Sequence, residues 1–347
     1  MRRKLLIGVG VLCVVAVGGY KGAEVFAEKK VRQRIDTQVA AMGMTGQVAY
    51  GKVDVDLIGS GASVSDFVFS EQGQPVWRID RLAVNQYTQD KQGNPTRFAG
   101  AITGAHLAFA EWAKLCKEKG VACAYEGDAE ALAAHGTTEM LVDASVDYRM
   151  DDPAKAITLE SALTLRDTID FAFKAKIIGL DNQAMAEAAA GAGRAIQANL
   201  PPAMALLVMG VQLGRTAEQV AVSDFGFAMK DLGGVRKGAM RRAEETNDQR
   251  PVDAVLAEQL SEAKVQLHAS AQPWMPEAFV DSMGKALDPF VWDHKPYRIT
   301  MAQAKPVLLL TRGQAGLELP REISNSRSLF DALTPKVDNA PLDAAVR

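Results

Sequence analysis

Apolar and polar residues alternate with a period of two over much of the chain, which is typical of antiparallel β-strands. The clearest run lies within residues 138–180, where the even positions from Met140 to Met150 are apolar and the odd positions from Asp143 to Arg149 are polar. A turn at residues 151–153 leads into two further segments of the same kind. We predict an antiparallel meander with one apolar face and one solvated face.

Other alternating segments change parity partway along. The apolar pairs on either side of the change are Val48, Tyr50 and Val53, Val55; Trp77, Ile79 and Leu82, Val84; and Val220, Val222 and Phe225, Phe227. A change of parity turns the apolar residues to the other face of a sheet unless a bulge intervenes. We therefore expect curved or bulged strands there, and an edge or bulge at Pro306 in a last strand, Tyr297–Leu310.

Helical spacing marks the remaining segments. Val31, Ile35 and Val39 recur at intervals of four and predict an amphipathic stalk helix. Further helices are expected at residues 182–199, 233–246, 253–263 and 279–287, and a short strand at residues 265–271. The polar residues beyond 333, interrupted by prolines, predict a disordered tail.

The N-terminal segment Leu5–Tyr20 has no charged residue and follows Arg2, Arg3 and Lys4. A helix continued to Phe26 reaches across the roughly 30 Å hydrocarbon layer at about 1.5 Å per residue. A cleaved signal peptide is the alternative, but an uncleaved anchor fits the long apolar run better. In both cases the basic residues stay in the cytoplasm and the bulk of the chain is exported.

These patterns predict an α+β protein in which an N-terminal transmembrane helix precedes a curved, mainly antiparallel β-sheet with helical insertions. The expected parts are a cytoplasmic stub and anchor at 1–27, the stalk helix at 28–43 and a β-rich periplasmic region at 44–180. Helices and returning strands of the same or a second domain follow at 181–333, and the tail at 334–347.

Composition narrows the possible functions. The net charge of −3 and the aromatic content of 6% give no basis for nucleic-acid binding, which needs a basic face. The four histidines are scattered without the spacing of metal ligands, and neither a phosphate-binding loop nor a nucleophile elbow occurs. We therefore expect no enzyme activity, no metal and no cofactor.

Cys116 and Cys123 are the two cysteines in the exported part. An even pair in an oxidising compartment predicts one small disulfide, with two reduced, buried thiols as the alternative.

An apolar sheet face must be covered by the chain itself or by a ligand. The residues predicted to contact lipid are Ile157, Leu159, Leu163, Leu165, Ile169, Phe171 and Phe173 of the meander, with Leu206, Leu207 and Met209 of the apolar stretch 203–213. For that stretch, plain core is the favoured interpretation and a lipid-lined groove the alternative. Arg236, Lys237, Arg241 and Arg242 could hold lipid headgroups beside a bilayer, or belong to a solvated connecting helix.

The order of these segments resembles the AsmA-like and YdgA-like bacterial inner-membrane proteins. The resemblance rests on the anchor RRKLLIGVGVLCVVAVGGY, the strands GKVDVDLIGSGASVSDFVFS and the meander ITLESALTLRDTIDFAFKAKIIGL. It implies a single-pass protein of the inner membrane with a periplasmic domain that binds acyl chains, for phospholipid handling or envelope homeostasis. Phospholipid and envelope proteins are the candidate partners. The alternative is a non-enzymatic periplasmic scaffold that binds protein partners through an exposed edge strand.

Overall fold

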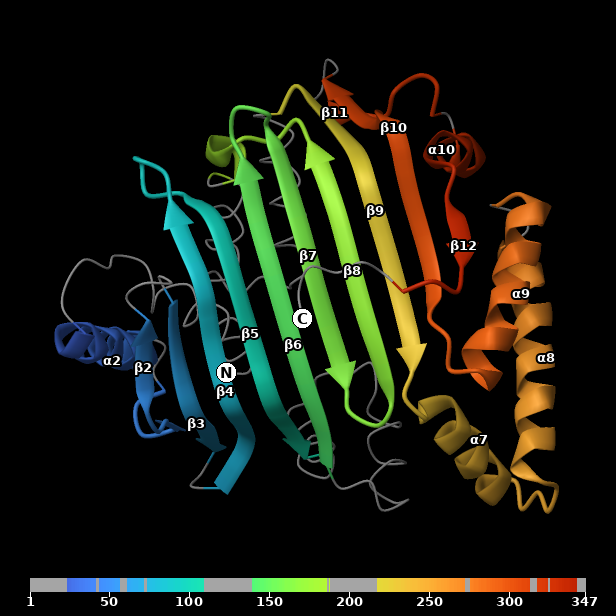
Figure 1. The fold of residues 1–347 in the computed structure, drawn as a ribbon, viewed down its shortest axis with the longest axis horizontal. Helices are drawn as coiled ribbons and strands as arrows, with labels where there is room; N and C mark the ends of the chain where they lie inside the picture. Colours follow the sequence, from blue (N-terminus) through green and yellow to red (C-terminus); the bar gives the residue numbers. More distant parts are fainter. Residues whose placement is uncertain are drawn as a thin grey trace. The chain divides into compact units, whose positions relative to one another are not determined.

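In the computed structural model the protein is mainly an antiparallel sheet with helices, which confirms the α+β prediction (Figure 1). The structure describes residues 24–41, 44–56, 61–71, 74–108, 139–185, 187, 217–271, 275–312, 317–323 and 325–341. Among these residues, no helix is both long enough and apolar enough to cross a membrane. The predicted anchor segment Leu5–Tyr20 lies outside them.

The chain divides into two compact units whose sequences interleave. Unit 1 contains residues 1–88, 98–146 and 163–166, and unit 2 contains residues 89–97, 147–162 and 167–347. All the boundaries between the two units lie within the region predicted to be β-rich, residues 44–180.

In unit 1 the strands β1 (Val48–Ala49), β3 (Gly61–Glu71), β4 (Gln74–Gln89), β5 (Pro95–Ala108) and β6 (Glu139–Asp151) are hydrogen-bonded in that order. A further strand, β2 (Val53–Asp56), also pairs with β3. The change of parity between Val48 and Val53 is thus a break between two strands that pair with the same neighbour.

Helix α2 (Glu24–Ala41) packs on this sheet. Its apolar stripe of Val31, Ile35 and Val39 is buried, together with Val53 of β2 and Phe67 of β3. Burial of the stripe explains why the residues recur at intervals of four. The helix predicted as a stalk is therefore part of the core of unit 1.

In the paired strands β3 and β4, the apolar residues change parity at neighbouring positions. Val64 and Phe67 on β3 are both buried, as are Ile79 and Leu82 on β4, although each pair is three residues apart. Asp66, between the first two, has a φ of 51°. The pairing of β3 with β4 keeps one register from Ala62 opposite Val84 to Phe69 opposite Trp77, so no bulge lies at this change of parity; the register shifts further along, between Phe69 and Ser70. The left-handed backbone at Asp66 lets β3 keep Val64 and Phe67 on one face without an extra residue.

In unit 2 the hydrogen-bonded order is β6, β7 (Ala156–Leu165), β8 (Ile169–Ile178), β9 (Gln219–Asp231), β10 (Tyr297–Arg312) and β11 (Leu317–Glu318), and β12 (Lys336–Asp338) also pairs with β10. The meander predicted at 138–180 is confirmed as β6, β7 and β8. The register shifts between Lys176 and Ile177 of β8, opposite Ser223 of β9, which confirms the bulge expected between Val222 and Phe225. A second shift brackets Pro306 in β10, as predicted.

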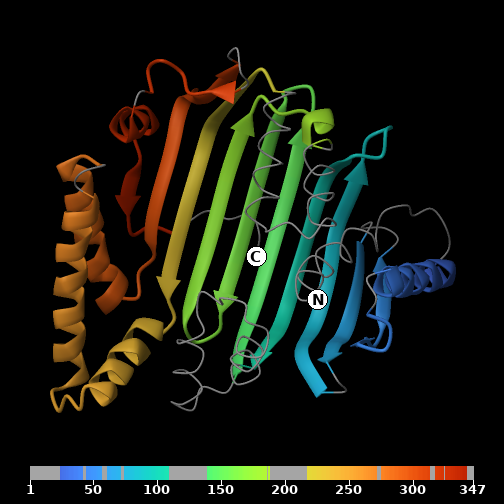
Figure 2. The same ribbon diagram turned by 180° about the vertical axis from the view of Figure 1, so that it is seen from behind.

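Three helices complete unit 2: α7 (Gly234–Glu245), α8 (Val252–Ala271) and α9 (Glu277–Trp292), which lie beyond the end of β9 and along β10 in both views (Figures 1 and 2). The strand predicted at residues 265–271 is wrong, because these residues are the last two turns of α8. Val265 is 67% exposed, so its apolar character does not report a buried strand face.

The C-terminal residues are ordered further than expected. Helix α10 (Ser326–Leu333) is followed by β12, which pairs with residues 298–300 of β10. Arg298 makes two hydrogen bonds of 2.7 and 2.6 Å to the Asp338 carboxylate, and the Asn339 side chain donates to the backbone oxygens of Ala286 and Pro296. These polar contacts order residues 334–341, which sequence polarity alone predicted to be disordered.

Candidate functional site

The strands β8, β9 and β10 of unit 2 present two chemically different faces. On one face, Phe171 lies opposite Met229 and Phe173 opposite Phe227, and Phe227 in turn lies opposite Ile299 of β10. The other face carries charge, including a 2.7 Å ion pair between Lys174 and Asp224. One face is therefore apolar and the other polar, as the alternation of the meander predicts, although the polar face is not fully open to solvent, since Asp170 Oδ1 is buried.

The two ends of the apolar face are closed by cores. At one end, Ile169, Met229, Tyr297 and Ile299 pack against the helices α7, α8 and α9. At the other end, Ile177 and Val220 pack with Met150, Ile157, Leu180 and Ala217. Both clusters consist of apolar side chains packed against one another. At its two ends, the apolar sheet face is therefore ordinary protein interior.

Between these clusters lie four phenylalanines, Phe171 and Phe173 of β8 with Phe225 and Phe227 of β9, which we call the aromatic patch. The ring centroids of Phe171 and Phe227 are 6.3 Å apart, and those of Phe173 and Phe225 are 5.6 Å apart in an edge-to-face arrangement. All four side chains are half-buried, and none belongs to either cluster. From Ile169 to Ile177 the face runs for about 26 Å at 3.3 Å per residue.

The structure separates the predicted lipid-contact residues into groups. Ile157 is 5% exposed and belongs to the closed cluster with Met150, and Ile169 packs against the helices. Leu159, Phe171 and Phe173 are half-buried residues of unit 2. Leu163 and Leu165 lie in unit 1, where Leu163 is 37% exposed and Leu165 is half-buried. Leu206, Leu207 and Met209 lie outside the described residues.

Phe225 and Phe227 were not among the predicted contact residues. Their alternation was visible in the sequence, but the pairing of β9 with β8 joins residues about fifty positions apart. No local pattern specifies such a partner, so the patch emerges only from the sheet register.

The four predicted headgroup cations of α7 already have partners within the chain. Arg236 donates to Asp253 at 2.6 Å and Arg242 to Glu262 at 3.1 Å, which ties α7 to α8. Lys237 donates to the Asp167 backbone oxygen, and Arg241 lies 3.4 Å from Glu245. These contacts support the alternative of a solvated connecting helix.

The described histidines do not form metal sites with carboxylates or thiols, since no group of three such side chains with suitable geometry occurs within the described ranges. His106 of β5 lies between two carboxylates of unit 1, with Nδ1 at 2.7 Å from Glu139 and Nε2 at 3.2 Å from Asp80. These contacts link side chains of the three neighbouring strands β4, β5 and β6. The predicted disulfide, Cys116 with Cys123, lies outside the described residues.

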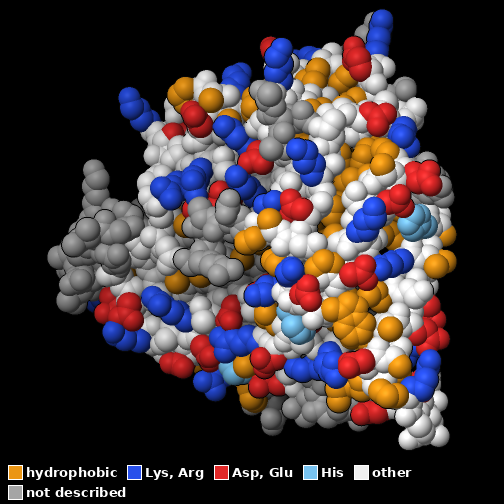
Figure 3. Space-filling view, turned by 45° about the vertical axis from the view of Figure 1, so that its right-hand side comes forward, with side chains coloured by type: hydrophobic (Ala, Val, Ile, Leu, Met, Phe, Trp, Pro, Cys, Tyr) orange, Lys and Arg blue, Asp and Glu red, His pale blue; other side chains and the backbone are white. Residues whose placement is uncertain are grey.

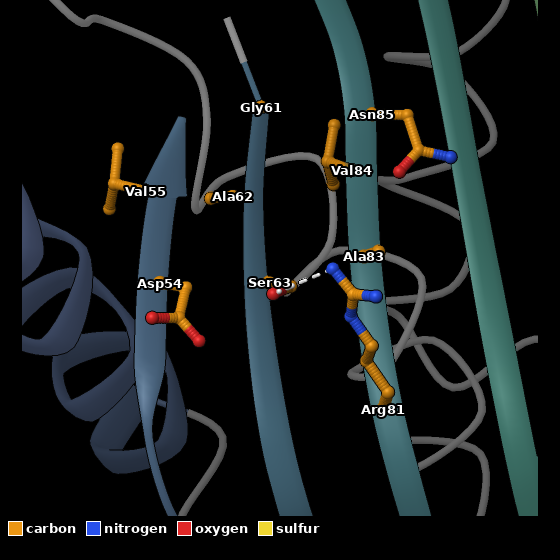
Figure 4. Close-up of a pocket in the computed structure, with 9 residues that line it drawn as sticks. All are labelled: Asp54, Val55, Gly61, Ala62, Ser63, Arg81, Ala83, Val84 and Asn85. Atoms are coloured by element: carbon orange, nitrogen blue, oxygen red, sulfur yellow. Dashed lines mark hydrogen bonds between the residues drawn. The ribbon is translucent and has the colours of Figure 1, made fainter. Parts of the chain in front are cut away.

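Unit 1 contains a polar cavity of about 340 Å³ over β2, β3 and β4 (Figure 4). Its lining residues are Asp54, Val55, Gly61, Ala62, Ser63, Arg81, Ala83, Val84 and Asn85. Arg81 points toward Ser63 across the space between β4 and β3, and its Nη2 donates to Ser63 Oγ at 3.3 Å. The cavity thus places a guanidinium and a hydroxyl together, with the Asp54 carboxylate on the neighbouring strand.

Comparison with known proteins adds no identification. No protein-family model matches the chain, and no curated protein matches it significantly. The resemblance to AsmA-like and YdgA-like proteins therefore stays a prediction.

Proposed function

We propose that the protein binds lipid acyl chains on the aromatic patch of unit 2 and acts in phospholipid handling or homeostasis of the cell envelope. In this proposal the segment from Leu5 to Phe26 anchors the chain in the inner membrane and the bulk of the chain is periplasmic. The observation that carries the proposal is the half-buried state of four phenylalanines between two closed clusters on one sheet face.

The chemistry of the patch favours a hydrocarbon chain over a peptide. Strands β8 and β9 are interior strands, and their backbone groups are used in the ladders with their neighbours. An extended peptide laid on this face would find no backbone partners for its own amides, and an unpaired buried amide costs about 1–3 kcal/mol. An acyl chain has no such groups to satisfy.

The edge of the sheet in unit 2 also gives little support to the alternative, a scaffold that binds partners by strand addition. The outer side of β10 pairs with β12 at residues 298–300 and with β11 at residues 311–312. Helix α10 packs against β10 as well. Short strands and a covering helix are the usual means of protecting an edge from added strands.

Apolar contact is the driving force in this proposal. Each buried methylene contributes about 0.8 kcal/mol, so ten methylenes contribute about 8 kcal/mol before the entropy of association is subtracted. Aromatic rings add large, rigid contact areas. In this proposal the chain and the rings together hold the lipid, and the net affinity is what remains after the association cost of about 4–15 kcal/mol.

Native mass spectrometry of the full chain, released from a maltoside detergent and paired with lipid extraction, tests the proposal. We expect phospholipid in near-stoichiometric amount that survives purification. A clean lipid-free mass with no uptake of added phospholipid would contradict acyl-chain binding. In that case crosslinking in intact envelopes would test the scaffold alternative.

Figure 3 shows a second region with exposed apolar side chains, which is the other candidate surface for binding a hydrocarbon chain. On the side that carries α8, α9 and α10, apolar side chains reach the surface in strips between charged ones (Figure 3). The exposed apolar residues of unit 2 include Met240, Val265, Trp292 and Leu319. Because charges interrupt them, they offer a poorer surface for a long hydrocarbon chain than the aromatic patch.

A further inference from the structure

Arg81 is the central group of the cavity in unit 1. Its side chain is exposed, and among the described residues its contact is the 3.3 Å hydrogen bond to Ser63 Oγ, with no carboxylate in ion-pair range. The neighbouring Arg78 on the same strand differs, because it lies 3.4 Å from Asp80. Arg81 therefore presents a guanidinium whose fork of donors is open to a ligand.

The floor of the cavity is built from small residues in close contact. Gly61 is buried, and a Cβ placed there would lie 2.7 Å from the backbone oxygen of Val84. Ser63 and Ala83 face each other across β3 and β4 and are also buried. A side chain at position 61 would collide with the backbone of β4, so the close approach of β3 and β4 beside the cavity requires glycine there.

Asp54 stands on the strand beside Ser63, opposite it in the register. Its carboxylate forms an ion pair with Lys52 at the surface. Exposed ion pairs of this kind contribute little to stability. The cavity wall therefore carries a positive group on β4 and a negative group on β2.

From this arrangement we propose that the cavity binds a small zwitterion, with an oxyanion held by Arg81 and Ser63 and a cationic group held by Asp54. Charge-assisted bonds from a guanidinium to a phosphate or carboxylate are about twice as strong as neutral ones. The volume of about 340 Å³ suits a small molecule. Phosphoethanolamine has this chemistry, as a phospholipid headgroup or as a free molecule. The proposal concerns unit 1 and is independent of acyl-chain binding in unit 2.

Calorimetric titration of the full chain in a maltoside detergent tests the site with three probes. These are phosphoethanolamine, glycerophosphoethanolamine, which is the headgroup diester without chains, and inorganic phosphate. We expect both zwitterions to bind more tightly than phosphate. The tighter of the two zwitterions identifies the source, since the diester represents a lipid headgroup and the monoester a soluble molecule.

Two substitutions and a matched control complete the test. Arg81→Gln should weaken both zwitterions by about tenfold, the loss of one charge-assisted bond. Asp54→Asn should reduce the preference for zwitterions over phosphate by a similar factor. Arg78→Gln removes an arginine of the same strand outside the cavity and should change binding less than about twofold.

The proposal fails if Arg81→Gln binds the zwitterions as the unsubstituted chain does, or if phosphate binds more tightly than both. It also fails if no probe binds up to about 10 mM, the range beyond which a Kd represents less than about 3 kcal/mol. Thermal unfolding of each variant checks that the fold is kept, and we expect melting temperatures close to that of the unsubstituted chain because both substituted side chains are exposed.

Discussion

Replacing Phe173 with aspartate separates a lipid-binding surface from ordinary core. Phe173 lies in the middle of the aromatic patch, half-buried, with its ring 5.6 Å from that of Phe225. If an acyl chain lies on the patch, the new carboxylate faces hydrocarbon. If the patch is only a region of core, the carboxylate disrupts the fold.

The expected magnitudes follow from the position of the ring. An aspartate in hydrocarbon costs about 3 kcal/mol, which corresponds to a loss of lipid affinity of about a hundredfold. Loss of the ring contact with Phe225 contributes about 1 kcal/mol to destabilisation, and the lost burial of a half-buried side chain about another 1 kcal/mol. We therefore expect the variant to be folded and to have lost its lipid.

Two control variants are compared with Phe173→Asp. Ala172→Asp places the same charge on the adjacent residue of β8, but on the face that carries Lys174, and should keep the lipid. Ile157→Asp places the charge in a closed cluster, at a side chain that is 5% exposed. An unpaired carboxylate there costs several kcal/mol, so this variant should unfold.

Lipid content by native mass spectrometry and unfolding by circular dichroism are measured on the same preparations. The reasoning is refuted if Phe173→Asp retains stoichiometric lipid, because the patch then does not contact it. It is equally refuted if Phe173→Asp unfolds together with Ile157→Asp, since the two positions would then be equivalent core.

Further predictions concern stability. Burial raises the pKa of Tyr297 from 10.0 to about 12, so the stabilising contribution of the neutral side chain is complete below pH 10 and is lost as the pH rises through about 12. In Tyr297→Phe this part of the alkaline unfolding profile should disappear, and an unchanged profile would contradict the prediction. The hydrogen bond from Arg298 lowers the pKa of Asp338 below 3.8, so the stabilising contribution of this ion pair is complete above about pH 4 and is lost as the pH falls further. Asp338→Asn should increase amide hydrogen exchange in β12, and unaltered exchange would show that β12 does not need the ion pair. Gly104 has a φ of 62°, and an added Cβ would lie 2.2 Å from Asp80 Oδ2. Gly104→Ala should therefore lower the free energy of unfolding by about 1–3 kcal/mol. A melting temperature equal to that of the unsubstituted chain would argue against backbone strain in this variant.

The strands could be predicted well where burial has a fixed period. The meander alternates over three successive segments, and β6, β7 and β8 follow it. Changes of parity were equally informative, since the change between Val222 and Phe225 coincides with a register shift opposite Lys176 and Ile177. A bulge leaves a trace in the sequence because it moves every later side chain to the other face.

Prediction failed where contacts at long range decide the structure. Residues 265–271 form helix because they continue α8, whose earlier residues Val255, Leu256 and Leu260 are buried in the cluster with α7 and α9. Seven residues are too few for a period of two to outweigh an adjoining helix. Residues 336–338 form a strand because β10 supplies the ladder and Arg298 the ion pair, and neither is visible in the polar sequence of the tail.

The candidate site was only partly predictable, for a related reason. Alternation shows which residues share an apolar face but not what covers them. Along β8 the same face passes from Ile169, packed against helices, through the half-buried Phe171 and Phe173, to Ile177 in a second closed cluster. All four positions have the same parity and similar apolar character, so the sequence cannot distinguish them. The difference becomes visible only from the clusters at each end of the strand, because Ile169 and Ile177 belong to them and Phe171 and Phe173 do not.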